Sequence, residues 1–280
     1  FMLAGHTAVA AGLGVLGAVV FVGVNAVVVR RQRAAHTALL LVGALAWLVG
    51  NVAFASDQGI GTTLPWWFAF LVLTIAAERL EMTRLMRRHP AAHPSLLAIV
   101  FALLAGAALS AIAPAAGGVV YGAALVALAA WLGVFDIARR TARAHGLSRY
   151  MALCLLGGYV WLAVAGVAWA GMSLGWPLRD AALHALGLGF IVSMVMGHAP
   201  VILPAVARIK LRFGAWFYAP LALLHASLIL RLAGGLVRPE LRTAGAVFNA
   251  VALALFAATV AGSALAWRAR GAPPLPTEAP

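Results

Sequence analysis

The chain has 280 residues, of which 64% are hydrophobic and 10% are charged, and its mean hydropathy is +1.01. Soluble domains contain roughly 45–50% apolar and about 25% charged residues, so this composition excludes a cytosolic enzyme and a secreted domain. The formal net charge of +13 lies in short basic runs between long apolar stretches, so we expect no nucleic-acid partner. The single cysteine, Cys154, excludes a disulfide framework. The composition predicts a polytopic membrane protein whose main partner is the lipid bilayer.

Nine apolar stretches are long enough to cross a membrane as helices, which takes about 20 residues each. Their hydrophobic runs are continuous and do not alternate, which favours helices over barrel strands. The predicted spans are residues 7–29, 37–55, 64–83, 95–113, 117–138, 150–172, 182–205, 214–235 and 243–267. We therefore predict an all-α transmembrane helix bundle of about nine spans in a single domain, residues 1–270, with a Pro-rich cytoplasmic tail, residues 271–280.

Basic residues follow every second span, so most of them would lie on one side of the membrane. The positive-inside rule places that side in the cytoplasm, with the N-terminus outside and the C-terminus inside. The protein is thus expected in the bacterial cytoplasmic (inner) membrane. The residues on the basic side are Arg30, Arg31, Arg33, Arg84, Arg87, Arg88, Arg139, Arg140, Arg143, Arg149, Arg208, Lys210, Arg212, Arg268 and Arg270.

Three histidines are predicted inside the hydrocarbon, where ionisable side chains cost about 2.5–3.5 kcal/mol and therefore indicate function. His184 and His198 belong to the seventh span, and in a regular α-helix they share a face about 21 Å apart along the axis. They cannot ligate the same metal, but they can serve two stacked sites. His225 lies in the eighth span, within roughly 10 Å of the depth of His198. Imidazoles from two facing helices suit the axial ligation of haem b, and they also suit copper.

The surroundings of His198 add further candidate ligands. Met194 lies one turn earlier and offers a soft thioether that could line or ligate the same cavity. Gly197 leaves room for a flat macrocycle or for close helix packing. Arg231, in the eighth span, either meets a haem propionate or faces the outer interface.

Glu78 is predicted inside the membrane, near the end of the third span. Glu81 shares its face and Arg79 lies between the two in sequence. Glu78 is either a metal ligand, a proton relay or a counter-charge for a cofactor, or it forms an internal ion pair with an arginine.

The remaining polar residues have simpler expectations. His6 is either the partner of His184 in an outer site or an interfacial side chain exposed to water. Asp136 ends the fifth span and is expected to pair with Arg139 or Arg140. Four further histidines are expected in cytoplasmic loops and not as ligands, namely His36, His89, His93 and His145.

The stretch at residues 182–200, ALHALGLGFIVSMVMGHAP, is followed by a basic loop and a histidine-bearing span and resembles the NnrS family. That family has an A-x-H-x-L-x-x-G stretch, matched at His184 and Gly189, and a later G-H-T-G-R element, matched at Gly197 and His198. The resemblance implies a polytopic membrane protein that contains haem and copper and acts in the nitric oxide and denitrification response.

These observations lead to one main hypothesis and two alternatives. The main hypothesis is a haem-b-type membrane protein, with or without copper, that has a redox or nitric-oxide-related role and a membrane redox partner. The first alternative is a proton- or metal-ion-coupled transporter in which the histidines and Glu78 form the pathway. The second is a structural or assembly subunit of a respiratory complex.

Overall fold

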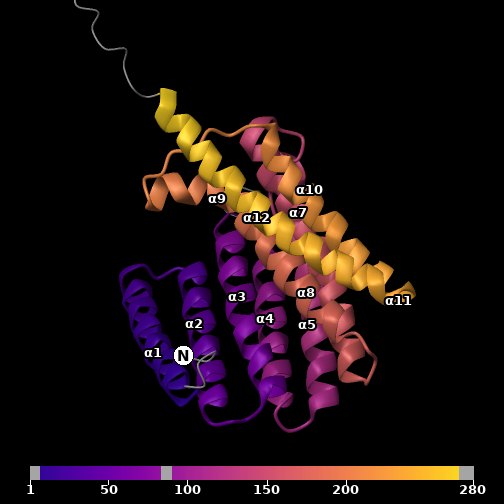
Figure 1. The fold of residues 1–280 in the computed structure, drawn as a ribbon. Helices are drawn as coiled ribbons and strands as arrows, with labels where there is room; N and C mark the ends of the chain where they lie inside the picture. Colours follow the sequence, from indigo (N-terminus) through magenta and orange to yellow (C-terminus); the bar gives the residue numbers. More distant parts are fainter. Residues whose placement is uncertain (1–6, 83–89, 271–280) are drawn as a thin grey trace, which may run out of the picture. The chain divides into compact units, whose positions relative to one another are not determined.

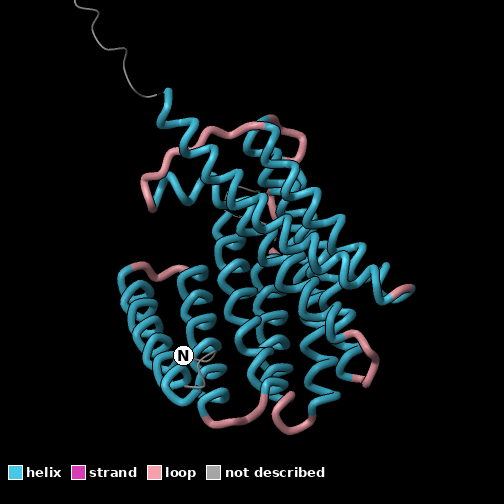
Figure 2. Tube along the Cα trace, viewed as in Figure 1, coloured by secondary structure: helices cyan, strands magenta, loops and turns pink. Residues whose placement is uncertain are grey.

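The computed structural model describes residues 7–82 and 90–270 (Figure 1). Within these ranges the secondary structure is helical and no strand occurs (Figure 2). They include nine helices that are long and apolar enough to cross a membrane. The predicted all-α fold is confirmed, and the chain is a multi-pass membrane protein. The orientation of its ends stays a prediction.

The helices follow the nine predicted spans to within a few residues. The first six spans are single α-helices: α1 (Thr7–Arg31), α2 (Ala35–Ala55), α3 (Ile60–Met82), α4 (Ala92–Leu109), α5 (Pro114–Phe135) and α7 (Gly146–Ser173). A short helix, α6 (Ala138–Thr141), precedes α7. The seventh span comprises α8 (Arg179–His184), the π-helix η3 (Ala185–Val192) and α9 (Ser193–Val206). The eighth comprises η4 (Ala215–Phe217), α10 (Tyr218–Ile229), the π-helix η5 (Leu230–Gly234) and α11 (Gly235–Val237), and the ninth is α12 (Pro239–Arg270).

The chain divides into two compact units, and each is described by itself. Unit 1 comprises the described residues of 1–137 and 159–186, and unit 2 those of 138–158 and 187–280. Helix α7 and the seventh span each contribute residues to both units. The single domain over residues 1–270 stays a prediction, and the tail at 271–280 lies outside the described residues.

In unit 1, aromatic rings join the first three helices. Trp47 of α2 stacks on Phe70 of α3, with ring centroids 5.3 Å apart. Phe21 of α1 meets both rings edge-on at 5.8 Å. Because aromatic pairs with such geometry contribute about 0.5–1.5 kcal/mol beyond their buried area, this triad holds α1 against its neighbours.

Glycines and a hydrogen bond bring α5 close to α3 and to the second half of α7. A Cβ atom added to Gly122 would lie 2.4 Å from the carbonyl oxygen of Gly166, so only hydrogen fits between these backbones. Small residues allow such close helix contacts in membranes. The buried hydroxyl of Tyr121 donates a hydrogen bond of 2.9 Å to the carbonyl oxygen of Pro65 on α3.

In unit 2, α10 packs along α12. The Asn249 amide on α12 donates a buried hydrogen bond of 2.6 Å to the Ser227 hydroxyl on α10. That hydroxyl in turn donates to the carbonyl oxygen of Leu224, 3.0 Å away. Side-chain hydrogen bonds between membrane helices stabilise them by about 0.6 kcal/mol on average.

Candidate functional site

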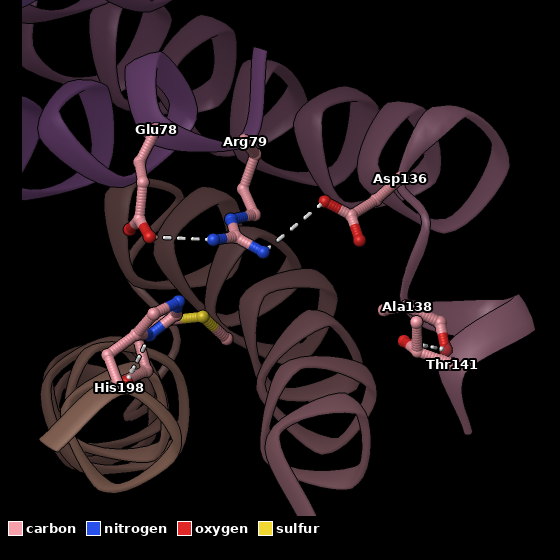
Figure 3. A network of polar contacts seen from close by, with 7 residues as sticks. Glu78, Arg79, Asp136, Ala138, Thr141 and His198 are labelled. Atoms are coloured by element: carbon pink, nitrogen blue, oxygen red, sulfur yellow. Dashed lines mark hydrogen bonds and ion pairs between the residues drawn. The ribbon is translucent and has the colours of Figure 1, made fainter. Parts of the chain in front are cut away.

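His198 lies on α9 in unit 2 and is buried, with 6% of its surface exposed. Its Nδ1 atom lies 2.7 Å from the backbone carbonyl oxygen of Met194, one turn earlier (dashed line at His198 in Figure 3). A carbonyl oxygen only accepts hydrogen bonds, so Nδ1 carries a hydrogen, and in the neutral ring the lone pair is on Nε2. Metal-ligating histidines are commonly oriented in this way through their other ring nitrogen.

His184 belongs to unit 1 and has the same kind of bond. Its Nδ1 atom lies 3.0 Å from the backbone oxygen of Asp180 and 3.1 Å from that residue's carboxylate. The side chain is about one-third exposed. Here too the backbone oxygen can only accept, so the geometry assigns the hydrogen to Nδ1.

His225 lies on α10 and packs against a glycine of α7 within unit 2. A Cβ atom added to Gly157 would lie 3.0 Å from both Cε1 and Nε2 of the His225 ring. A contact this short is tighter than nearly all real Cβ contacts, so glycine lets the ring approach the backbone of α7.

Two more of the predicted site residues, Met194 and Gly197, contact α7 close to Gly157. The methyl group of Met194 occupies the place that a side chain at Gly158 would take. A Cβ atom on Gly197 would lie 2.9 Å from the Cβ atom of Cys154. We refer to residues 154–158 as the α7 contact segment.

The α7 contact segment is not evident from the sequence alone. The available signal was a Gly-Gly pair, Gly157–Gly158, one turn after a cysteine in the middle of an apolar span. Small residues in a transmembrane helix indicate close packing. They do not indicate which helix approaches, and only the structure shows that α9 and α10 both do so.

The π-helix η3 changes the expected relation between His184 and His198. The shared face was derived for a regular α-helix, but residues 185–192 between the two histidines are π-helical. A π-helix has i→i+5 hydrogen bonds and turns less per residue, so the angle derived for a regular α-helix does not apply and the assumption of a uniform α-helix was wrong. π-Helical turns inside α-helices often occur at functional sites.

A second π-helix, η5, contains Arg231. Its backbone is contacted by α12, because a Cβ atom on Gly245 would lie 2.5 Å from the Arg231 nitrogen. The Arg231 side chain is half-buried. Its role toward a haem propionate stays a prediction.

Unit 1 contains a buried ion-pair network at the end of α3 (Figure 3). The Arg79 guanidinium donates a hydrogen bond of 2.7 Å from Nη2 to Oε1 of Glu78, and its Nη1 lies 3.8 Å from Oδ2 of Asp136. The Arg79 side chain is 5% exposed and that of Asp136 is 0% exposed, whereas Glu78 is 45% exposed. The buried hydroxyl of Tyr159 interacts electrostatically with all three groups.

This network bears on two expectations. Glu78 forms the internal ion pair that was one of its two interpretations, and its partner Arg79 is buried. Asp136 was expected to pair with Arg139 or Arg140, and that pairing stays a prediction. The structure adds an ion pair with Arg79, which lies 57 positions earlier in the chain.

The other histidines have varied positions. His36 was expected in a loop, but it lies on α2 and its Nδ1 is 2.6 Å from Oε2 of Glu81 on α3. His93 and His145 are exposed, but His93 lies in the first turn of α4 and not in the expected loop. His6 and His89 lie outside the described residues.

Across residues 7–82 and 90–270, no three His, Cys, Asp or Glu side chains lie close enough together to hold a metal ion. Axial ligation of haem needs two imidazoles, and a thioether such as that of Met194 also binds copper. Of the residues predicted as ligands, Met194, His198 and His225 belong to unit 2, while Glu78 and His184 belong to unit 1.

The apolar helices and the buried ionisable side chains define this chain as a polytopic α-helical membrane protein with polar groups inside its spans. A family model described as "Domain of unknown function (DUF8744)" matches residues 1–265. The chain belongs to this family. Comparisons of the chain with curated proteins and with solved structures found no match.

Proposed function

We propose that this protein is a haem-b-type protein of the bacterial cytoplasmic membrane, with His198 and His225 as the candidate axial ligands. The supporting observation is the buried hydrogen bond from His198 Nδ1 to the Met194 carbonyl oxygen, which leaves Nε2 with the lone pair in the neutral ring. A redox or nitric-oxide-related role, with a membrane redox partner, follows from the resemblance to the NnrS family.

In unit 2 the chemistry of the candidate ligand side chains suits haem b, whereas the packing around them does not add support. The two imidazoles on α9 and α10 are suitable ligands, and Arg231 on η5 suits a propionate. The places opened by Gly157, Gly158 and Gly197 are occupied by protein side chains, so the proposal rests on the ligands and not on an open slot. A bound haem would supply one-electron transfer or the binding of a diatomic gas at iron.

Copper is the second metal proposed. The Met194 thioether contacts α7 beside Gly158, and the thioether and imidazole donors of unit 2 are those that copper accepts. His184 would hold a separate metal or haem in unit 1, since its ring is oriented by Asp180 in the same way.

The visible spectrum of the purified protein tests the haem proposal. We expect a Soret band in protein from haem-replete cells and its loss or strong reduction in His198→Ala and in His225→Ala. His145→Ala is the matched control, because that histidine is exposed and should leave the band unchanged. A colourless wild-type protein, or a band that survives both ligand substitutions, would refute the proposal. Metal analysis of the same samples tests copper.

A proton- or ion-coupled transporter is the second candidate, and the network around Arg79 favours it. Charged side chains inside a membrane commonly mark ion or proton pathways, and here Asp136 and Arg79 are almost fully buried. Transport would be measured as a pH change inside proteoliposomes, with Asp136→Asn and Glu78→Gln as variants. Flux in the wild type that these variants abolish supports transport, while no flux above that of empty vesicles refutes it.

A further inference from the structure

A cluster of basic side chains lies where the loop between α9 and α10 meets the last turns of α12 in unit 2. Lys210 and Arg212 belong to this loop, and Arg208 begins it. The sequence has no Asp or Glu at 181–239 or 241–277. The positive charge of this cluster is therefore not balanced by acidic residues of the loop or of the later turns of α12. Glu240, in the first turn of α12, is about 40 Å along the helix from Trp267.

The loop is fixed to α12 by two reciprocal hydrogen bonds. The Arg212 backbone N–H donates to the carbonyl oxygen of Ser263 at 3.3 Å, and the Ser263 hydroxyl donates to the carbonyl oxygen of Arg212 at 2.5 Å. The next residue, Phe213, stacks on Phe217 with ring centroids 5.3 Å apart. These contacts hold the backbone that carries both cations, so the loop loses little further freedom when a ligand binds.

Each cation lies over the face of an exposed tryptophan. The Lys210 Nζ atom is 5.6 Å from the centre of the Trp267 ring, and the Arg212 guanidinium carbon is 5.7 Å from that of Trp216. The two tryptophans are 46% and 45% exposed. Tryptophan prefers the headgroup level of a bilayer, so we expect the two cations beside these indoles to lie at that level.

Two backbone features keep this arrangement. The indole of Trp216 folds over Gly214, where the atoms of an added side chain would overlap the ring. Arg208 has a left-handed backbone with φ of 57°, which non-glycine residues rarely adopt and which persists only where the surroundings impose it.

We propose that the α9–α10 loop and the end of α12 bind the phosphate group of an anionic phospholipid. Arginine and lysine both donate several hydrogen bonds to phosphate, and basic pockets between membrane helices are known to suit such headgroups. A lipid is the anion that a membrane-embedded surface meets at the highest local concentration. The site does not depend on the haem proposal, because it uses none of the candidate ligands.

Native mass spectrometry of the whole purified protein, in a mixture of equal amounts of phosphatidylglycerol and phosphatidylcholine, tests this site. We expect the wild type to retain phosphatidylglycerol preferentially. We expect each of the two basic side chains that contact the bound lipid to contribute about a fivefold preference, so Lys210→Gln/Arg212→Gln should lose about 25-fold. The matched control is Arg30→Gln/Arg31→Gln, a pair at the exposed end of α1 that belongs to unit 1 and not to this site, and it should keep the preference.

A second variant separates the arrangement of the site from its net charge. Gly214→Ala displaces the Trp216 indole without changing any charge, and it should lower the retention of phosphatidylglycerol while the helix content by circular dichroism stays unchanged. Equal retention of both lipids by the wild type would overturn the proposal, and so would unchanged retention in the Lys210 and Arg212 double variant. Displacement of the lipid by millimolar inorganic phosphate would also overturn it, since it would indicate a site for the free anion.

Discussion

Replacing Gly197 with alanine tests the contact between α7 and α9 at the position just before His198. The added Cβ atom would lie 2.9 Å from the Cβ atom of Cys154, whereas carbon atoms in contact prefer about 3.5–4.0 Å. The Cys154 Cβ atom is attached directly to the backbone, so rotation of a side chain cannot relieve the overlap. The two helices must therefore separate by about 0.6 Å or more.

The expected cost follows from two opposing effects. Overpacking of this kind destabilises a protein by about 1–3 kcal/mol, while alanine in place of a helical glycine recovers about 0.5–1 kcal/mol. We expect Gly197→Ala to lower the free energy of unfolding by about 1–2 kcal/mol. It should be measured by titration with a denaturing detergent, with helix content followed by circular dichroism.

Two companion variants make this result interpretable. Gly262 on α12 has open space around its Cα atom, so Gly262→Ala should be neutral or stabilise by up to about 1 kcal/mol. Cys154→Gly in the Gly197→Ala background removes the overlapping atom, and a double-mutant cycle should show favourable coupling. If Gly197→Ala is as stable as Gly262→Ala, α7 and α9 do not make this contact and the reasoning fails.

Three further outcomes follow from unit 1 and from the α7 contact segment. Arg79→Met removes the cation beside the fully buried Asp136 and should lower the free energy of unfolding by about 3 kcal/mol; adding Asp136→Asn should recover much of this loss, and no recovery would contradict the ion pair. Tyr121→Phe deletes the hydrogen bond to the Pro65 carbonyl oxygen and should cost about 1 kcal/mol in the same titration, whereas an unchanged midpoint would mean that the bond contributes nothing. Cys154 is fully buried, so a maleimide should label it only after unfolding; rapid labelling of the folded protein would show that the α7 contact segment is open.

The positions of the spans were predictable because the bilayer imposes a local rule. Each crossing needs about 20 apolar residues, and each backbone polar group must be satisfied within its own helix. The hydropathy of about 20 adjacent residues is therefore sufficient to locate a span. Accordingly, α1 and α12 begin and end within a few residues of the predicted bounds. The π-helical segments were not predictable in this way. The contact of Gly245 with the backbone of Arg231 shows that close packing by the following span, α12, accompanies one of them.

The candidate ligands were predictable because ionisable residues are rare in apolar spans. His198 stood out on that basis, and its hydrogen bond one turn back is local to α9. The ion pair between Asp136 and Arg79 was not predictable, since Arg79 lies on α3 and only the rotation of that helix about its axis directs the guanidinium toward Asp136. The loop position expected for His36 was wrong for a similar reason, because this residue lies on α2 and its contact with Glu81 joins α2 to α3.

The sequence by itself thus determined that the chain crosses a membrane, where each helix runs and which few polar residues lie within it. These properties depend on the transfer of single segments from water to lipid, which adjacent residues decide. Only the tertiary structure decided that α9 and α10 meet α7 at Cys154–Gly158, and that Arg79 neutralises Asp136. Those contacts depend on the rotation and spacing of whole helices, which follow from the packing of residues far apart in the chain.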